Sequence, residues 1–123
     1  MIDLSKIKAK ELPKKTIKVN ILGTVQEQEI TVLTGENRIK SWSLDYTQNP
    51  EESTLKRVRI CLTGGAGVPE KDAELLIHLD WDAAVEICGQ VMEFTREFDD
   101  KISAEKSDAE KNLKAETETG IPG

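Results

Sequence analysis

The stretch WDAAVEICGQVMEFTREFDDKI, residues 81–102, decides the fold because it carries the longest helical pattern in the chain. Its apolar side chains, together with Thr95, recur every three or four residues, the spacing that places side chains on one face of an α-helix. These positions are Ala84, Val85, Cys88, Val91, Met92, Thr95, Phe98 and Ile102. Asp80 precedes the run and suits the N-cap position. We therefore predict a long amphipathic helix at about 81–102.

Three shorter helices are predicted ahead of it, each from a start signal and an apolar face. Pro50 and Pro69 suit the first helical turn, where the missing N–H of proline costs nothing, and Thr34 suits an N-cap. The expected bounds are about 35–46, 50–63 and 69–78. The expected inward-facing residues are Ile39, Trp42 and Tyr46 in the first helix and Leu55, Val58, Cys61 and Leu62 in the second.

A β-hairpin is predicted at 16–33, before the helices. Ile17, Val19 and Ile21 alternate with polar residues, which is the period of a strand with one buried face. A second alternating run begins at Val25, and the short connection through Gly23 is typical of an antiparallel hairpin. Because an isolated two-stranded hairpin is marginal in water, its apolar face must lie on helices or on another chain.

The two ends of the chain have different compositions from this central part. Residues 1–15 are rich in lysine and are predicted to be a flexible basic lead-in, whereas 104–123 have almost no large apolar residue and are predicted to be a disordered charged tail. Residues 16–103 then form a single domain. Since the hairpin precedes all the helices, the fold class is α+β with segregated elements.

The charge distribution argues against binding to nucleic acid. The net charge is −6, and residues 63–123 carry 15 Asp and Glu against 6 Lys and Arg. Duplex binding requires basic surfaces that neutralise phosphates, and the only dense group of cations lies at Lys6, Lys8, Lys10, Lys14 and Lys15. We interpret that group as part of a solvated segment.

Hydropathy and cysteine content predict a cytosolic protein. No segment approaches the roughly 20 consecutive apolar residues of a membrane span, and residues 1–12 lack the apolar stretch of a signal peptide. Cys61 and Cys88 have no CxxC pairing and no neighbouring histidine, which favours two reduced, buried thiols. We expect neither secretion nor membrane insertion.

No catalytic, cofactor or metal site is predicted. His78 is the only histidine. It ends an apolar helix, where the helix dipole favours a positive charge, so we interpret it as a structural residue rather than as a catalytic base. The glycines of the GGAGV segment, 64–68, lack the Lys and Ser/Thr of a phosphate-binding loop. Acidic pairs such as Asp99 and Asp100 do not match the spacing of a Ca²⁺ loop. We expect no enzymatic activity and no cofactor.

The aromatic residues are the best candidates for partner contacts, because aromatics are the usual anchors of protein interfaces. Four of them are predicted to bind a partner. They are Trp42, Tyr46, Phe94 and Phe98. Phe94 lies off the main stripe of the long helix and would widen its apolar face toward a second surface, although ordinary packing explains it equally well.

The order of these elements resembles the tail assembly chaperones of long-tailed bacteriophages and prophages. The likeness comprises a lysine-rich lead-in, the hairpin TIKVNILGTVQEQEITVL at 16–33, and a closing long helix with its tail. Residues 79–112 (LDWDAAVEICGQVMEFTREFDDKISAEKSDAEKN) also resemble the family in residue pattern. The family has no invariant active-site residues, so no catalytic role is carried over.

The resemblance implies a chaperone without ATP that binds the long helical tape-measure protein, keeps it soluble until the tail tube polymerises, and is absent from the mature virion. Its location would be the cytoplasm of the bacterial host. The family commonly has a longer, frameshifted form that recruits the tail tube protein, and Glu110, Lys111 and Asn112 permit a slippery codon run. The exposed hairpin edge also suggests self-association through strand addition.

Two alternatives remain open at this point. A virion tail structural or accessory subunit would also be small, acidic and α+β. A cytosolic regulatory module that binds another protein would have the same composition. All three readings require a protein-binding surface, and none requires a cofactor, a membrane or nucleic acid.

Overall fold

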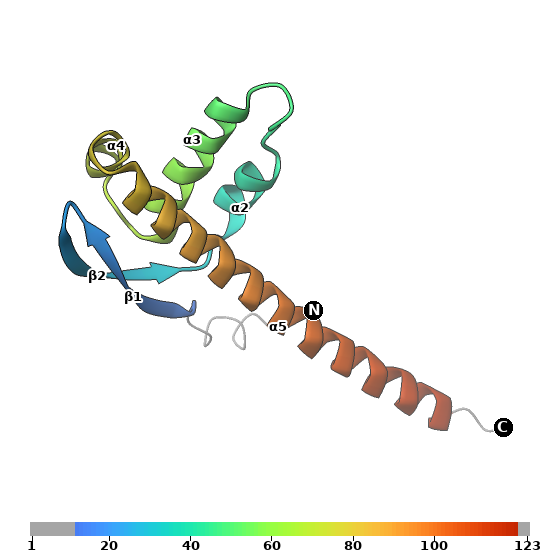
Figure 1. Cartoon of the computed structure of the whole chain (residues 1–123). Coiled ribbons are helices and arrows are strands. Elements are labelled where there is room, and N and C mark those ends of the chain that lie inside the picture. Colours follow the sequence, from blue (N-terminus) through green and yellow to red (C-terminus); the bar gives the residue numbers. More distant parts are fainter. Residues whose placement is uncertain (1–11, 121–123) are drawn as a thin grey trace.

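A β-hairpin and three short helices lie around one long helix (Figure 1). The structure is a computed structural model that describes residues 12–120, with side chains to residue 112. The elements are β1 (Lys14–Ile21), β2 (Thr24–Thr31), α2 (Gly35–Trp42), α3 (Pro50–Ile60), the π-helical turn η1 (Cys61–Gly65), α4 (Glu70–Leu79) and α5 (Trp81–Gly120). This order confirms the predicted α+β fold, with the hairpin first and a long helix last.

The hairpin forms a two-stranded antiparallel sheet in which Ile21 pairs with Thr24 and Lys14 with Thr31. Ile17 and Val19 are buried, which confirms the predicted inner face of β1. Ile30 of β2 lies on the same face of the sheet as Ile17 and Val19, and it is also buried. No third strand pairs with the sheet in the described part of the chain, so its apolar face is covered by helices.

The hairpin turn has an unusual residue at its first position. Leu22 and Gly23 both have positive φ, 52° and 87°, as a type I′ turn requires. Glycine adopts this conformation freely, but for leucine the left-handed region costs about 1–2 kcal/mol. Leu22 is also 63% exposed, so packing of its side chain offsets little of that cost.

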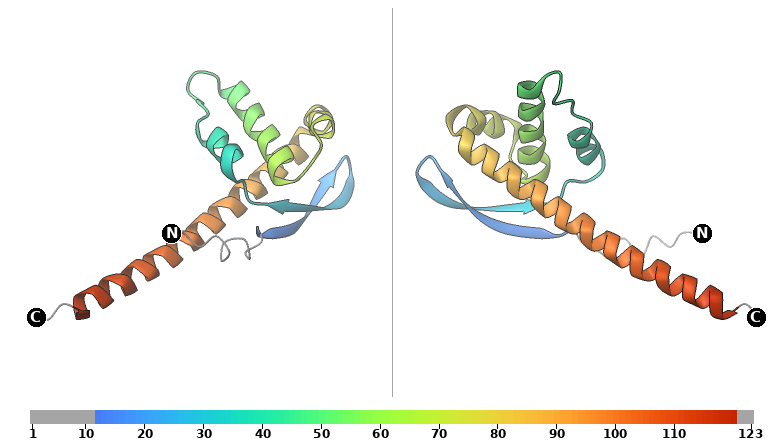
Figure 2. Two further views of the ribbon diagram at one scale, coloured as in Figure 1. Left: turned by 180° about the vertical axis from the view of Figure 1, so that it is seen from behind. Right: turned by 45° about the vertical axis from the view of Figure 1, so that its right-hand side comes forward.

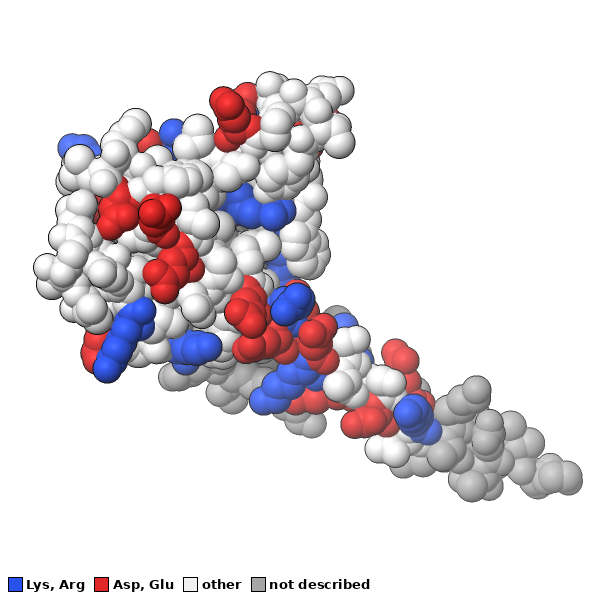
Figure 3. Space-filling view, in the orientation of Figure 1, with Lys and Arg blue, Asp and Glu red and all other residues white. Residues whose placement is uncertain are grey.

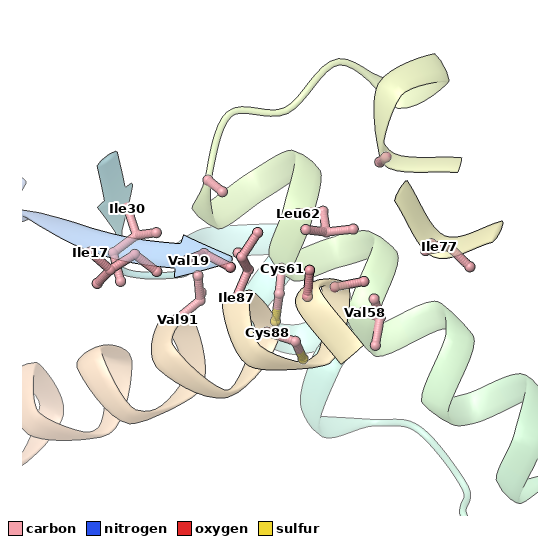
Figure 4. Packing of buried hydrophobic residues seen from close by; sticks show 14 of the residues in the cluster. Ile17, Val19, Ile30, Val58, Cys61, Leu62, Ile77, Ile87, Cys88 and Val91 are labelled. Carbon is pink, nitrogen blue, oxygen red and sulfur yellow. The ribbon is translucent and has the colours of Figure 1, made fainter. Parts of the chain in front are cut away.

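The hydrophobic core lies where the hairpin, α3 and α5 meet (Figure 4). Figure 4 shows Ile17, Val19 and Ile30 of the hairpin facing Ile87 and Val91 of α5. Val58, Cys61 and Leu62 of α3 and η1 fill the other side, as predicted, and Leu55 packs against them. Gly65 permits the close approach of η1 to α5, because a Cβ atom there would overlap with Val91.

Two polar side chains attach α5 to the hairpin. The Asp80 carboxylate accepts hydrogen bonds from Ala83 N at 3.2 Å, which confirms its predicted capping role, and from Leu22 N at 2.8 Å. Thr95 is buried, and its hydroxyl donates to Val91 O at 2.8 Å and accepts from Leu33 N at 3.0 Å. The turn and the exit of the hairpin are therefore both fixed to the same helix.

The buried face of α5 agrees with the predicted stripe at most positions. Ala84, Cys88, Val91 and Thr95 are buried. Val85 was predicted on the same face, but it is 42% exposed, and Ala83 and Ile87 are buried in its place. The buried stripe is therefore turned slightly toward the hairpin, because the hairpin and α3 both pack on α5.

The helix predicted at 35–46 is shorter in the structure. It ends at Trp42, and Tyr46 lies in the following loop, where the Asp45 carboxylate accepts a hydrogen bond from Thr47 N at 2.9 Å. The Thr47 hydroxyl also donates to this carboxylate, and the two bonds stabilise a turn and lower the pKa of Asp45, the hydroxyl bond most. The predicted inner face is also wrong, since Ile39 and Trp42 are exposed and Ser41 is the buried residue.

The last helix extends beyond its predicted end near residue 102 and reaches Gly120, so the segment predicted as a disordered tail has helical backbone over 104–120 (Figure 2). Every described side chain from 103 to 112 is exposed. Ala, Glu and Lys in this segment have high helix propensity, which maintains the helix without packing. Of the predicted lead-in 1–15, residues 1–11 lie outside the described residues, and β1 already begins at Lys14.

None of the helices within residues 12–120 contains an apolar stretch long enough to span a lipid bilayer.

Replacing Val91 with Ala should lower the free energy of unfolding by about 2 kcal/mol, because the side chain is fully buried between the hairpin and Gly65. Val85→Ala is the matched control on the exposed side of α5, and it should change stability by less than about 0.5 kcal/mol. Urea denaturation followed by circular dichroism measures both. Equal effects of the two substitutions would contradict the observed orientation of α5.

Replacing Leu22 with Asn should raise the free energy of unfolding by up to about 1 kcal/mol, because Asn tolerates positive φ and keeps the N–H that binds Asp80. Val25→Asn removes an equally exposed apolar side chain from the adjacent strand without affecting the turn, and it should give no gain. Denaturation curves that show Leu22→Asn to be neutral or destabilising would refute the strained turn.

Candidate protein-binding surface

A hollow of about 560 Å³ lies between α2 and the middle of α5. Trp42 of α2 forms one wall and is 62% exposed. The wall on α5 consists of Gly89, Met92, Glu93, Thr95, Arg96 and Asp99. We call this feature the Trp42 hollow. It combines an exposed indole with a partly apolar floor, which is the composition of many protein interfaces.

Arg38 holds the Trp42 hollow in shape. Its guanidinium forms an ion pair with Asp99 at 2.9 Å and lies 5.6 Å from the centre of the Trp42 ring, while its Nε donates to Leu33 O at 3.1 Å. Both charged side chains of the ion pair are about one-quarter to one-third exposed. The contacts with Asp99 and Leu33 O fix Arg38, which in turn lies over the face of the indole.

Gly89 opens the floor of the hollow. It lies inside α5, where glycine is less stable than alanine by about 0.5–1 kcal/mol. A Cβ atom at this position would have no neighbour within 4 Å, so packing inside the molecule does not require glycine. The folded chain therefore leaves a vacant space beside Trp42 at a cost in helix stability.

A stripe of four residues connects the Trp42 hollow to a second hollow. Trp81, Val85, Gly89 and Met92 follow one another at helical spacing along one side of α5, and we call them the α5 stripe. Trp81 is 39% exposed and lines an open hollow of about 470 Å³ together with residues of α3 and α4. Those residues are Pro50, Glu51, Thr54, Leu55, Ile77 and His78.

A row of carboxylates runs beside the α5 stripe. Asp82, Glu86, Glu93 and Asp100 are exposed, lie on the adjacent side of the helix, and form no ion pair with the described residues. Figure 3 shows acidic atoms, with basic atoms between them, along the visible side of α5. The surface is therefore apolar along one line and acidic along the next.

Tyr46, a predicted contact residue, is half-buried between α2 and α3. Its ring centre lies 4.7 Å from the Arg57 guanidinium, which also donates to Ser41 O at 3.1 Å. Burial raises the pKa of Tyr46. The Tyr46 hydroxyl and Arg57 Nε are buried and have no hydrogen-bond partner among the described residues. Tyr46 thus packs behind the Trp42 hollow rather than in its lining.

Phe94 and Phe98 lie on a different side of α5 from the side that lines the Trp42 hollow. Phe94 is partly buried against the core, and Lys15 Nζ of β1 lies 5.9 Å from its ring centre. Phe98 is half-buried one turn further along. The structure therefore does not bring the four predicted aromatics together, and only Trp42 lines the surface described above.

The outer edges of the hairpin differ in accessibility. On β2 the Gln28 amide donates to Glu29 O at 2.8 Å and to Ala66 O at 2.7 Å, so part of that edge is occupied. β1 has exposed Lys14 and Lys18 along its edge, and lysine disfavours edge pairing. Self-association through the hairpin edge stays a prediction.

The residues considered for chemistry lie at separate places in the fold. Cys61 and Cys88 lie side by side in the core (Figure 4), and the neighbouring Cys88 thiol together with burial raises the pKa of Cys61. The raised pKa disfavours the thiolate of Cys61, whereas the contact with Cys61 lowers the pKa of Cys88. His78 is exposed and lines the second hollow together with Trp81. Within residues 12–112, no three His, Cys, Asp or Glu side chains cluster in a way that suits a metal ion.

Sequence reasoning missed two features of the surface, the open position at Gly89 and the exposure of the apolar face of α2. Gly89 interrupts an otherwise strong helical stretch without ending it, and that was the available signal. Ile39 and Trp42 share one helical face, but periodicity does not state whether such a face is covered.

Comparisons of the chain with protein-family models, with curated proteins and with solved structures each find no match.

Replacing Gly89 with Ala should raise the free energy of unfolding by about 0.5–1 kcal/mol, because the new methyl group enters open space and alanine favours the helix. Gly65→Ala is the matched substitution at a glycine in close contact, and overlap with Val91 should lower stability by about 1–3 kcal/mol. Chemical denaturation of both variants tests the assignment. A destabilised Gly89→Ala variant would show that the space beside Trp42 is not open.

Proposed function

We propose that this chain is a phage tail assembly chaperone, a binding protein that covers apolar helical segments of the tape-measure protein until the tail tube polymerises. The observation that carries the proposal is the unpartnered apolar surface along α5, which ends beside the exposed Trp42. The order of hairpin, short helices and long closing helix is the order on which the family resemblance rests.

The chemistry of the surface suits a chaperone that uses no nucleotide. Apolar side chains of the α5 stripe would replace the contacts that the partner later makes within the tail. The acidic exterior, with a net charge of −6, would keep the complex dispersed by mutual repulsion. Binding of this kind needs neither a catalytic group nor a cofactor.

The proposal predicts that a tape-measure fragment becomes soluble when it is co-expressed with this chain. The fragment should move from the insoluble to the soluble fraction and elute with the chain on size-exclusion chromatography. The fragment alone, and the fragment with an unrelated acidic protein of similar size, are the controls. An insoluble fragment that does not associate would overturn the proposal.

Purified phage particles separate the chaperone from a tail subunit. A chaperone should be present in lysates of infected cells and absent from particles by mass spectrometry. Detection in particles at a constant stoichiometry would favour the virion-subunit alternative instead.

A further inference from the structure

The α5 stripe is an apolar helix face that the rest of the molecule covers only at one end, where Met92 packs against the core. The buried face of α5 is directed toward the hairpin and α3, whereas Trp81, Val85 and the open position at Gly89 lie outside that contact. From Trp81 to Met92 the stripe covers about 17 Å at the helical rise per residue. That length matches about three turns of a second helix lying against it.

The Trp42 hollow, at about 560 Å³, has room for a bulky side chain of a partner. Its floor is missing a Cβ atom at Gly89, and its wall is an indole that Arg38 holds in place. Helix-to-helix recognition commonly places a large residue of one helix over a small residue of the other. Because a Cβ atom at Gly89 would meet nothing within 4 Å, the position leaves room for a side chain of a partner.

The carboxylate row biases the charge of that partner, since its three nearest members outnumber Arg96, the one cation in the lining of the Trp42 hollow. Asp82, Glu86 and Glu93 are exposed on one flank of the stripe and form no ion pair with the described residues. A helix that carried Glu or Asp against this flank would be repelled, whereas Lys or Arg would be attracted. The charge therefore selects among amphipathic helices of otherwise similar shape.

We infer that the α5 stripe and the Trp42 hollow are the docking site for one amphipathic helix of about three turns. The helix inserts a bulky apolar residue beside Trp42 and over Gly89, and it directs Lys or Arg toward Asp82, Glu86 and Glu93. This inference rests on the proposed function in taking the partner to be helical. It adds the surface, the insertion point and the charge of the flank.

The first test uses three labelled 18-residue peptides and the full chain, with fluorescence anisotropy as the readout. One peptide has leucines on one helical face and lysines on the flanks, the second has glutamates in place of the lysines, and the third has the first composition in an order without a stripe. The chain should bind the first peptide at least tenfold more tightly than the other two. Equal binding of the three peptides would overturn the inference.

Gly89→Leu is the decisive variant, because it fills the hollow without removing a contact and replaces glycine with a strong helix former. Its affinity for the lysine peptide should fall at least tenfold while its melting temperature stays equal or rises. Leu75→Asp removes an exposed apolar residue of α4 outside the docking site and should change affinity by less than twofold. Unchanged binding by Gly89→Leu would refute the insertion point.

Charge reversal tests the flank. The double variant Glu86→Lys with Glu93→Lys should prefer the glutamate peptide to the lysine peptide. Retained preference for the lysine peptide would contradict the assigned orientation. If the unsubstituted chain is a dimer that Gly89→Leu dissociates on size-exclusion chromatography, the occupant is a second copy of this chain and the inference fails.

Co-expression with the tape-measure fragment distinguishes failure of this docking site from failure of the proposed function. If both the unsubstituted chain and Gly89→Leu keep the fragment soluble, the function stands and the docking site is wrong. If the unsubstituted chain does not keep it soluble, the function is wrong, and the peptide titrations alone decide the docking site.

Discussion

A two-stranded sheet cannot bury its own apolar face, and the rest of this molecule is arranged around the helix that covers it. α5 contacts both strands, α3, η1 and α4. Val91 fills the contact with the hairpin, and Gly65 permits η1 to approach the same point. The polar bonds of Asp80 and Thr95 then fix the two ends of the hairpin to one helix. Because α5 has one face occupied in this way, its opposite side is the surface available to partners.

Much of the fold could be predicted because periodicity reports a face that is buried along a whole element. The alternation of Ile17 and Val19 and the helical recurrence of Ala84, Cys88, Val91 and Thr95 were both confirmed. Residues 35–46 were harder, since the short helix has an apolar face at Ile39 and Trp42 that the molecule does not cover. An apolar helix face is buried within the molecule only when another segment of the chain packs against it. The helical backbone beyond residue 102 depends on local propensity, which a burial argument does not measure.

The candidate surface was predicted only in part for a related reason. Trp42 was identified by residue type, whereas Tyr46, Phe94 and Phe98 share that type and pack elsewhere. Gly89 contributes by lacking a side chain, so no count of apolar residues detects it. The acidic row is visible in the sequence as an excess of charge. Its place beside the α5 stripe follows from helical spacing, but the exposure of both is known only from the structure.

The turn at Leu22 has a consequence for the order in which the chain folds. A leucine in the left-handed region makes the hairpin a poor local nucleus, since its turn is disfavoured before any distant contact exists. The bond from Leu22 to Asp80 joins residues 58 positions apart and forms only once α4 and α5 are in place. Strand pairing is thereby coupled to docking on the helices, and non-local coupling of this kind slows folding while making it cooperative. We therefore expect the helical part of the chain to form first and the sheet to assemble on it.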